Sequence, residues 1–142
     1  MSFDLKLSNG NLQIKPDGSL ATVGISEKLH QDILKMIVTP IGGNKAHPWY
    51  GCGINKSLIG NIFDLNFAKD AASEQLKSAI ENLQALQQQQ AKTQYITASE
   101  SIAAINDVYI NTNKNDMRAI EVKVSILSYA LTTLDIGFLI KL

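Results

Sequence analysis

The clearest pattern along this chain is an alternation of apolar and polar residues in its last third. Ile120, Val122, Val124 and Ile126 alternate with charged or hydroxyl residues, and the segment 133–141 repeats the alternation. A period of two places every second side chain on the same face of a strand. The sequence therefore predicts strands over 119–127 and 133–141, preceded by an extended segment over 102–110 and a turn over 111–116.

Apolar residues spaced three and four apart predict two main helices. The first is expected to be capped by Ser26 and to end near Val38, because Thr39 precedes a proline. The second runs from about Asn66 to Gln90 without Gly or Pro, and at 1.5 Å per residue it would extend roughly 40 Å. So long a helix is expected to project at its C-terminal half, where Gln84 and the run 87–90 form either a solvated end or a partner-binding end.

The N-terminal segment 4–23 has turn dipeptides between short extended runs. Asn9-Gly10 and Pro16-Asp17-Gly18 predict a β-hairpin or a strand with a meander. Strands, then helices, then strands indicate an α+β fold. We expect one domain over residues 1–142, in which a mostly antiparallel sheet, built from the N-terminal hairpin and the C-terminal strands, packs with two main helices, one of them long.

The segment from Thr39 to Gly60 concentrates unusual residues. It contains two of the prolines, five of the glycines, the single Trp, the single Cys and one His. Prolines fix φ and glycines permit positive φ, so this density predicts a loop of defined shape, followed by one helical turn over 55–59 that Gly60 ends. Trp49 and Tyr50 either cover helix ends of their own domain or anchor a partner.

Charge and length limit the possible functions. Thirteen basic and thirteen acidic side chains give a formal net charge of zero, which argues against a nucleic-acid binder. Charged residues make up 18% of the chain, below the roughly 25% of average proteins, which suits a subunit with a partly covered surface. We expect no signal peptide and no membrane-spanning segment, and synthesis in the cytoplasm.

No arrangement of residues indicates catalysis. A single Cys52 excludes an internal disulfide, and two histidines do not give a zinc-ligand cluster. His47 is interpreted as a structural or interface residue rather than a base, and the glutamates occupy polar contexts rather than facing a second acid. The glycines form no phosphate-binding motif. We therefore predict no catalytic, cofactor-binding or metal-binding residues.

A series of short motifs resembles the small baseplate wedge family of contractile tails, often called the sheath initiator or lysozyme-like baseplate protein. The motifs, in order, are Gly18-Ser19-Leu20, Gly24, Gln31-Asp32-Ile33, Thr39-Pro40, Gly42, Pro48-Trp49-Tyr50-Gly51 and Leu58-Ile59-Gly60, followed by the segment 101–110. The resemblance covers roughly 17–127. Members commonly carry Glu-Pro-Arg where this chain has Ser99-Glu100-Ser101, and an Arg after Thr-Pro-x-Gly where it offers Lys45.

The resemblance implies a structural role in the tail of a phage or phage-like particle. Such proteins sit at the top of the baseplate, and their sheet accepts a strand from the first sheath ring. Expected partners are other wedge proteins, the sheath protein and the tail tube, in an assembly with several copies. The expected location is the virion, after assembly in the host cytoplasm. The expected partner-binding residues are Lys45, His47, Pro48, Trp49, Tyr50, Gly51, Glu100 and Ser101.

Two other hypotheses remain open from the sequence. The lysozyme-like label of the family suggests a peptidoglycan-cleaving enzyme, which would need a buried pair of carboxylates. A stand-alone adaptor domain unrelated to tails would behave as a monomer that binds no sheath protein.

Overall fold

The last third of the chain folds as a three-stranded antiparallel sheet in the computed structural model, which describes residues 2–59, 64–116 and 118–141. Its strands are β5 (Ile102–Thr112), β6 (Ala119–Ser128) and β7 (Thr133–Lys141), in the spatial order β5-β6-β7. The predicted strands are confirmed. β6 lies in the centre, so the free edges of the sheet belong to β5 and β7.

The alternation of apolar residues continues across the three strands as rows. In one row Val124 of β6 lies between Val108 and Ile136, and in another Val122 of β6 lies between Ile110 and Phe138. These side chains belong to the hydrophobic core, whereas Tyr109 and its neighbours in the intervening rows lie on the other face. One face of the sheet is therefore apolar and covered, as period two requires.

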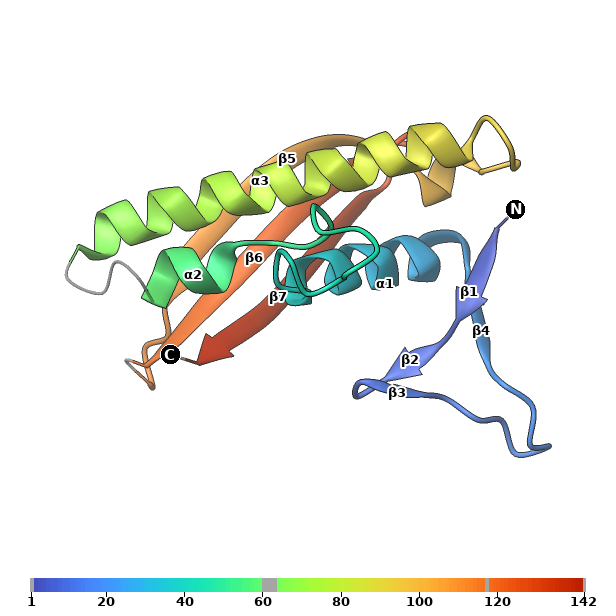
Figure 1. The fold of residues 1–142 in the computed structure, drawn as a ribbon, viewed down its shortest axis with the longest axis horizontal. Helices are drawn as coiled ribbons and strands as arrows, with labels where there is room; N and C mark the ends of the chain where they lie inside the picture. The colour runs from blue at the N-terminus through green and yellow to red at the C-terminus, as the bar shows by residue number, and fades with distance from the viewer. Residues whose placement is uncertain (1, 60–63, 117, 142) are drawn as a thin grey trace.

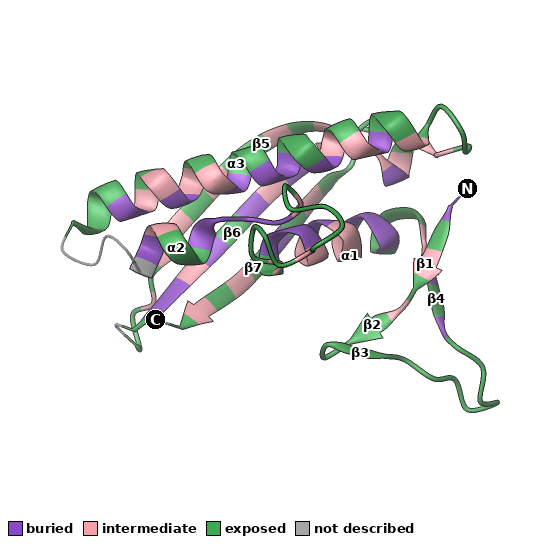
Figure 2. Ribbon diagram, viewed as in Figure 1, coloured by how far each residue is buried: buried purple, intermediate pink, exposed green. Residues whose placement is uncertain are grey.

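Two long helices and a short one cover that face of the sheet. They are α1 (Ile25–Val38), α2 (Ile54–Ile59) and α3 (Leu65–Gln90), and a 3-10 turn, η1 (Ala98–Glu100), precedes β5. Figure 1 shows the helices on one side of the sheet, which gives a two-layer α+β arrangement and confirms the predicted class. Figure 2 shows buried positions along the surfaces where the two layers meet.

The ends of α1 agree with the prediction at one terminus only. The helix stops at Val38, and Thr39, held extended before Pro40, donates its N–H and hydroxyl to the Lys35 carbonyl at 3.1 and 2.7 Å. The expected Ser26 cap is wrong, because Gly24 is the capping residue and no side chain caps the first turn. α2 matches the predicted turn over 55–59, and Gly60 lies outside the described residues.

The C-terminal half of α3 does not project, which corrects the sequence expectation. Leu83 and Gln87 are buried. The Gln87 side chain donates a hydrogen bond to the Glu100 carbonyl and accepts one from the Ile102 N–H. α3 runs along β5, whose length of 11 residues gives the long helix a matching surface. Only the outer face at its end, including Gln88 and Gln89, is solvated.

None of the helices within the described ranges has the length and apolar composition that a bilayer crossing requires.

The N-terminal strands form a separate arm. β1 (Phe3–Leu5) pairs with β4 (Thr22–Gly24), and β2 (Leu7–Ser8) pairs with β3 (Asn11–Leu12). The two predicted turns are confirmed, but these strands pair only with one another, not with the C-terminal sheet. Three backbone bonds join their hairpins in a ring, from Lys6 to Ala21, from Ala21 to Gln13 and from Gln13 to Lys6, at 2.8 to 2.9 Å. Figure 1 shows the arm beside α1.

Candidate functional site

The loop between α1 and α2 is closed at its base by the backbone. Pro40 and Cys52 form a parallel bridge, and the Cys52 N–H donates to the Thr39 carbonyl at 2.8 Å. Within the loop, Gly42 donates to the Pro48 carbonyl at 3.0 Å and Gly43 donates to the Pro40 carbonyl at 2.9 Å. The predicted loop of defined shape is therefore confirmed.

Gly51 belongs to the interior of this loop. It is buried, its φ is +123°, and a Cβ placed on it would lie 2.5 Å from the Thr39 carbonyl oxygen. No other residue fits this position without moving the bridge. In the folded chain Gly51 shapes the loop and offers no side chain to a partner.

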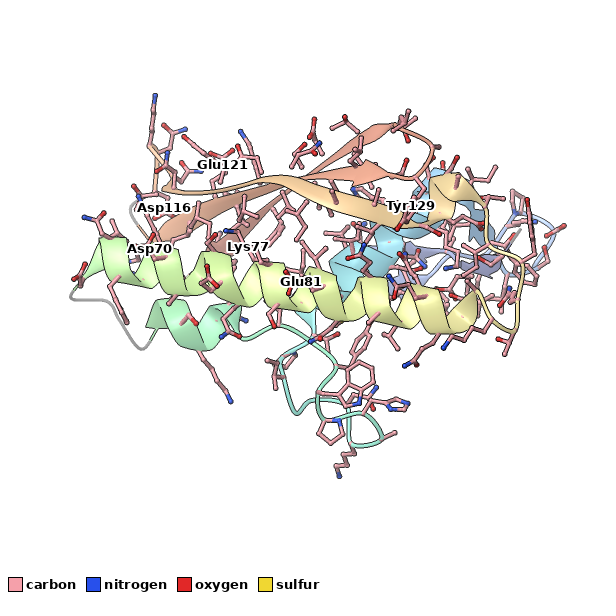
Figure 3. The ribbon with its side chains drawn as sticks, turned by 90° about the horizontal axis from the view of Figure 1, so that it is seen from above. Asp70, Lys77, Glu81, Asp116, Glu121 and Tyr129 are labelled. Atoms are coloured by element: carbon pink, nitrogen blue, oxygen red, sulfur yellow. The ribbon has the colours of Figure 1, made fainter. Side chains whose placement is uncertain are left out.

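The tip of the loop presents the other predicted residues to solvent. Lys45, His47, Pro48 and Trp49 are exposed, and Trp49 keeps 46% of its surface accessible. The Trp49 ring contacts the His47 ring at 5.6 Å between centroids and the Tyr50 ring at 6.4 Å. Figure 3 shows this loop on the side of α3 away from the sheet. The structure thus brings four of the predicted residues together on one projection whose base is held by backbone hydrogen bonds.

Tyr50 lies at the foot of the projection. Its ring packs against the hydrophobic core, and burial raises the pKa of its hydroxyl. The charges of Lys35, Asp32 and Asp4 also act on it. Of the two aromatic residues, Tyr50 fits the role of covering its own domain, whereas Trp49 remains available to a partner.

Glu100 and Ser101 lie apart from the loop, where η1 leads into β5. Glu100 is 2% exposed, and its two carboxylate oxygens accept four hydrogen bonds, from Ser2 and Thr97. Burial acts to raise its pKa, but these bonds outweigh that effect and lower the pKa to about 2. The Glu100 carboxylate is therefore engaged inside the chain, and Ser101 is half-buried with its hydroxyl directed at the Thr97 carbonyl, 3.4 Å away.

The β5 edge of the sheet is partly closed by α3. Gln87 accepts from the Ile102 N–H at 2.9 Å, and Gln84 donates to the Ile102 carbonyl at 3.1 Å. Two irregularities in the β5 register follow, one of which falls at Asn106. Lys77 and Glu81 of α3, labelled in Figure 3, line a hollow beside this bulged stretch. Bulges and covering side chains both oppose the addition of a further strand.

The β7 edge is open. Ser128 donates its N–H to the Thr132 carbonyl, so every second residue from Thr132 directs its backbone groups toward β6. The alternate set directs its N–H and C=O groups outward: Thr133, Asp135, Gly137, Leu139 and Lys141. Within the described part of the chain, no backbone hydrogen bond reaches these residues from another element. This edge is free to pair with another chain.

The fold matches a solved structure. A crystal structure from Geobacter sulfurreducens, described as a "putative tail lysozyme", has a TM-score of 0.58 to this chain at 11% sequence identity. The match covers 87% of this chain and 96% of the Geobacter protein. At this identity the likeness concerns the fold. No protein-family model and no curated protein sequence matches the chain.

The Geobacter protein is described as a "putative tail lysozyme", and Glu100 is the buried carboxylate among the described residues of this chain. A general acid for glycoside hydrolysis needs a raised pKa and a second carboxylate across a cleft. Glu100 has a lowered pKa and is almost fully buried. Among the described residues, no group of three or more His, Cys, Asp or Glu is placed to hold a metal ion.

Sequence reasoning did not find the surface of α1 beside the open edge. Val38 is 64% exposed although it extends the apolar face of the helix, and it lines hollows that also touch Leu134 and Phe138 of β7. The sequence feature that indicates this surface is the width of the apolar face of α1. Leu34 and Val38 widen that face beyond the stripe of buried core residues on the same helix, Leu29, Ile33 and Met36. An apolar face that is too wide for one packing surface indicates a second one.

Proposed function

We propose that this chain is a structural, non-enzymatic subunit of the baseplate of a contractile phage or phage-like tail. In this proposal it joins other wedge proteins to the tail sheath and templates the first sheath ring, in several copies around the tail tube. The fold likeness to a protein described as a tail lysozyme supports the tail assignment. The residue motifs that resemble the sheath initiator family support it independently.

The observation that carries the proposal is the difference between the two sheet edges. β5 begins with its backbone groups bonded to Gln84 and Gln87, whereas β7 has outward groups along its whole length. A strand from a sheath subunit would add to β7 through main-chain hydrogen bonds, which give affinity without altering the buried face. The exposed loop tip around Trp49 then serves for contact with a wedge protein, since aromatic anchors dominate binding energy at interfaces.

Gly137 offers a matched pair of variants that tests this proposal. Its N–H points outward from β7, and its φ is not in the positive region. Gly137→Pro removes that donor and adds a ring at the edge, which edge strands tolerate. Gly137→Ala keeps the donor, and its Cβ would meet Lys123 Cγ at an ordinary 3.7 Å.

The experiment uses the full chain, assembled into baseplates by co-expression with the proposed wedge proteins and the sheath protein. We expect Gly137→Pro to prevent sheath growth from baseplates in electron micrographs, and Gly137→Ala to support it as the native chain does. Equal melting temperatures of the two variants would establish that both fold. Normal sheath growth on Gly137→Pro baseplates would refute strand addition at β7.

The description of the Geobacter protein as a lysozyme gives a second candidate, a peptidoglycan-cleaving enzyme of the baseplate. A turbidity assay on purified cell walls separates the two functions. Clearing by the native chain that a single Glu→Gln replacement abolishes would establish the enzyme. A cell-wall suspension that stays turbid at high protein concentration would favour the structural role.

A further inference from the structure

A slot lies beside the beginning of β7. It is a hollow of about 590 Å³ between the N-terminal arm and β7, with α1 along its length. Its apolar lining comes from all three parts of the chain: Leu7 and Val23 from the arm, Leu34 and Val38 from α1, and Leu134 from β7. An extended segment that pairs with the outward groups of β7 would enter this slot.

The charged side chains that line the slot, Lys6, Glu27 and Lys35, each have a neighbour of opposite charge, and the Lys6–Glu27 pair is the more exposed and more widely spaced. Lys6 lies 3.9 Å from Glu27, and Lys35 is bonded to Asp4 and lies 3.2 Å from Asp32. A charged side chain entering the slot would have to compete with these partners and would lose its own hydration. The slot therefore suits an uncharged, apolar side chain.

A second, smaller hollow follows along the same strand. It measures about 220 Å³ and lies between the end of α1, the start of α2 and residues 138–140 of β7. Ile37 and Ile54 contribute to its lining together with Phe138. Val38 borders both hollows, so its exposed side chain separates them.

The register of β7 sets the spacing between the hollows. Leu134 touches the first and Phe138 touches the second, and both point to the helical side of the sheet, as does Ile136 between them. Four residues along a strand span about 13 Å. A strand paired with β7 would therefore direct two side chains, four residues apart, into the hollows, and direct the side chain midway between them at Val38.

We propose that β7 selects a partner segment with the pattern large apolar, any, small, any, large apolar. The inference rests on the proposed strand addition and goes beyond it by specifying the side chains of the incoming strand. Backbone pairing at an edge carries little sequence information, so specificity resides in the pockets for alternate side chains. The two hollows and the intervening Val38 provide such pockets.

Two labelled peptides of identical composition test the pattern. One is Lys-Thr-Leu-Thr-Ala-Thr-Leu-Thr-Lys, with its leucines four apart, and the other is Lys-Thr-Leu-Thr-Leu-Thr-Ala-Thr-Lys, with its leucines two apart. We expect fluorescence anisotropy to show binding at least tenfold tighter for the first peptide. Equal affinities for the two peptides, or no binding of either, would overturn the inference.

A reciprocal variant tests the role of Val38. Val38→Ala should relax the requirement for a small central residue, so that Lys-Thr-Leu-Thr-Leu-Thr-Leu-Thr-Lys binds the variant at least tenfold more tightly than the native chain. Leu131→Ala, at a turn position that is 80% exposed, is the matched control and should leave this peptide unchanged. An unchanged affinity in Val38→Ala would contradict the assigned separation of the hollows.

The outcomes distinguish this inference from the proposed function. If Gly137→Pro blocks sheath growth while the two peptides bind alike, strand addition stands and the side-chain pattern is refuted. If Gly137→Pro leaves sheath growth intact, strand addition at β7 is refuted whichever peptide binds.

Discussion

Glu100 accepts two hydrogen bonds from Ser2, a residue 98 positions earlier in the chain, at 3.0 Å from the backbone N–H and 2.9 Å from the hydroxyl. The other carboxylate oxygen accepts from the N–H and hydroxyl of Thr97 at 2.8 and 2.7 Å, which completes a capping box. One buried side chain therefore holds both the turn before β5 and Ser2, the residue that leads into β1.

The hydrogen bonds to Glu100 make the stability of the fold depend on pH. The pKa of Glu100 is about 2 in the folded chain and 4.5 in the reference state, so the carboxylate stabilises the fold above pH 4.5 and loses that effect as pH falls toward 2. The full contribution is roughly 3 kcal/mol by linkage. We expect the urea midpoint to fall between pH 6 and pH 3, and Glu100→Gln to reduce this dependence. Glu81→Gln, on the exposed face of α3, is the control and should retain it.

Gly51 should tolerate alanine much less well than Gly42. Both have positive φ, but only at Gly51 would the new Cβ meet backbone, 2.5 Å from the Thr39 carbonyl oxygen, and Gly42 has nothing within 4 Å. We expect a loss of roughly 2–4 kcal/mol for Gly51→Ala and about 1 kcal/mol for Gly42→Ala in the free energy of unfolding. Equal losses in chemical denaturation would show that the bridge between Pro40 and Cys52 does not constrain the loop.

Gln87 should matter to stability far more than its neighbour Gln88. The Gln87 amide donates to the Glu100 carbonyl at 3.0 Å and accepts from the Ile102 N–H at 2.9 Å. It therefore satisfies two backbone polar groups at the start of β5. Gln87→Met leaves both groups unpaired and should cost roughly 2 kcal/mol. Gln88 is exposed, and Gln88→Met should change the free energy of unfolding by less than about 0.5 kcal/mol. Similar thermal shifts for the two variants would contradict this role.

Trp49 provides a direct test of the loop tip as a contact. It is the single tryptophan and is 46% exposed, so its emission in the free protein reports on a partly solvated ring. If the chain joins wedge proteins as proposed, we expect a blue shift on complex formation, because the partner would displace water from the ring. Trp49→Ala should weaken that complex by about 2 kcal/mol, with little change in melting temperature. Identical spectra of free and assembled protein would indicate that the ring serves only its own domain.

Local patterns predicted the helices and strands because each depends on residues close in sequence. The alternation over 119–127 and 133–141 placed two strands, and Pro40 placed the end of α1. Ser26 was misassigned because the arm delivers the chain to α1 through Gly24, and the path of the arm depends on distant contacts. The Gln-rich end of α3 was misjudged for the same reason, since its partners at 100–102 are more than ten residues away.

The candidate partner surface was likewise predicted in part from the sequence and in part only visible in the structure. The density of Gly and Pro predicted a shaped loop, and the loop tip holds four of the proposed residues in solvent. The interior positions of Gly51 and Glu100 could not be predicted, because burial is a property of the packed chain. The open edge also required the structure, since strand order decides which strands lie outermost.

The sequence alone determined the class of fold, the boundaries of most elements and the absence of net charge, because periodicity, turn chemistry and composition are local or additive. Tertiary structure decided which sheet edge is free, which predicted residues reach solvent and where two hollows flank Val38. Those properties arise only when segments far apart in sequence, such as the arm, α1 and β7, are brought together by the burial of a common core.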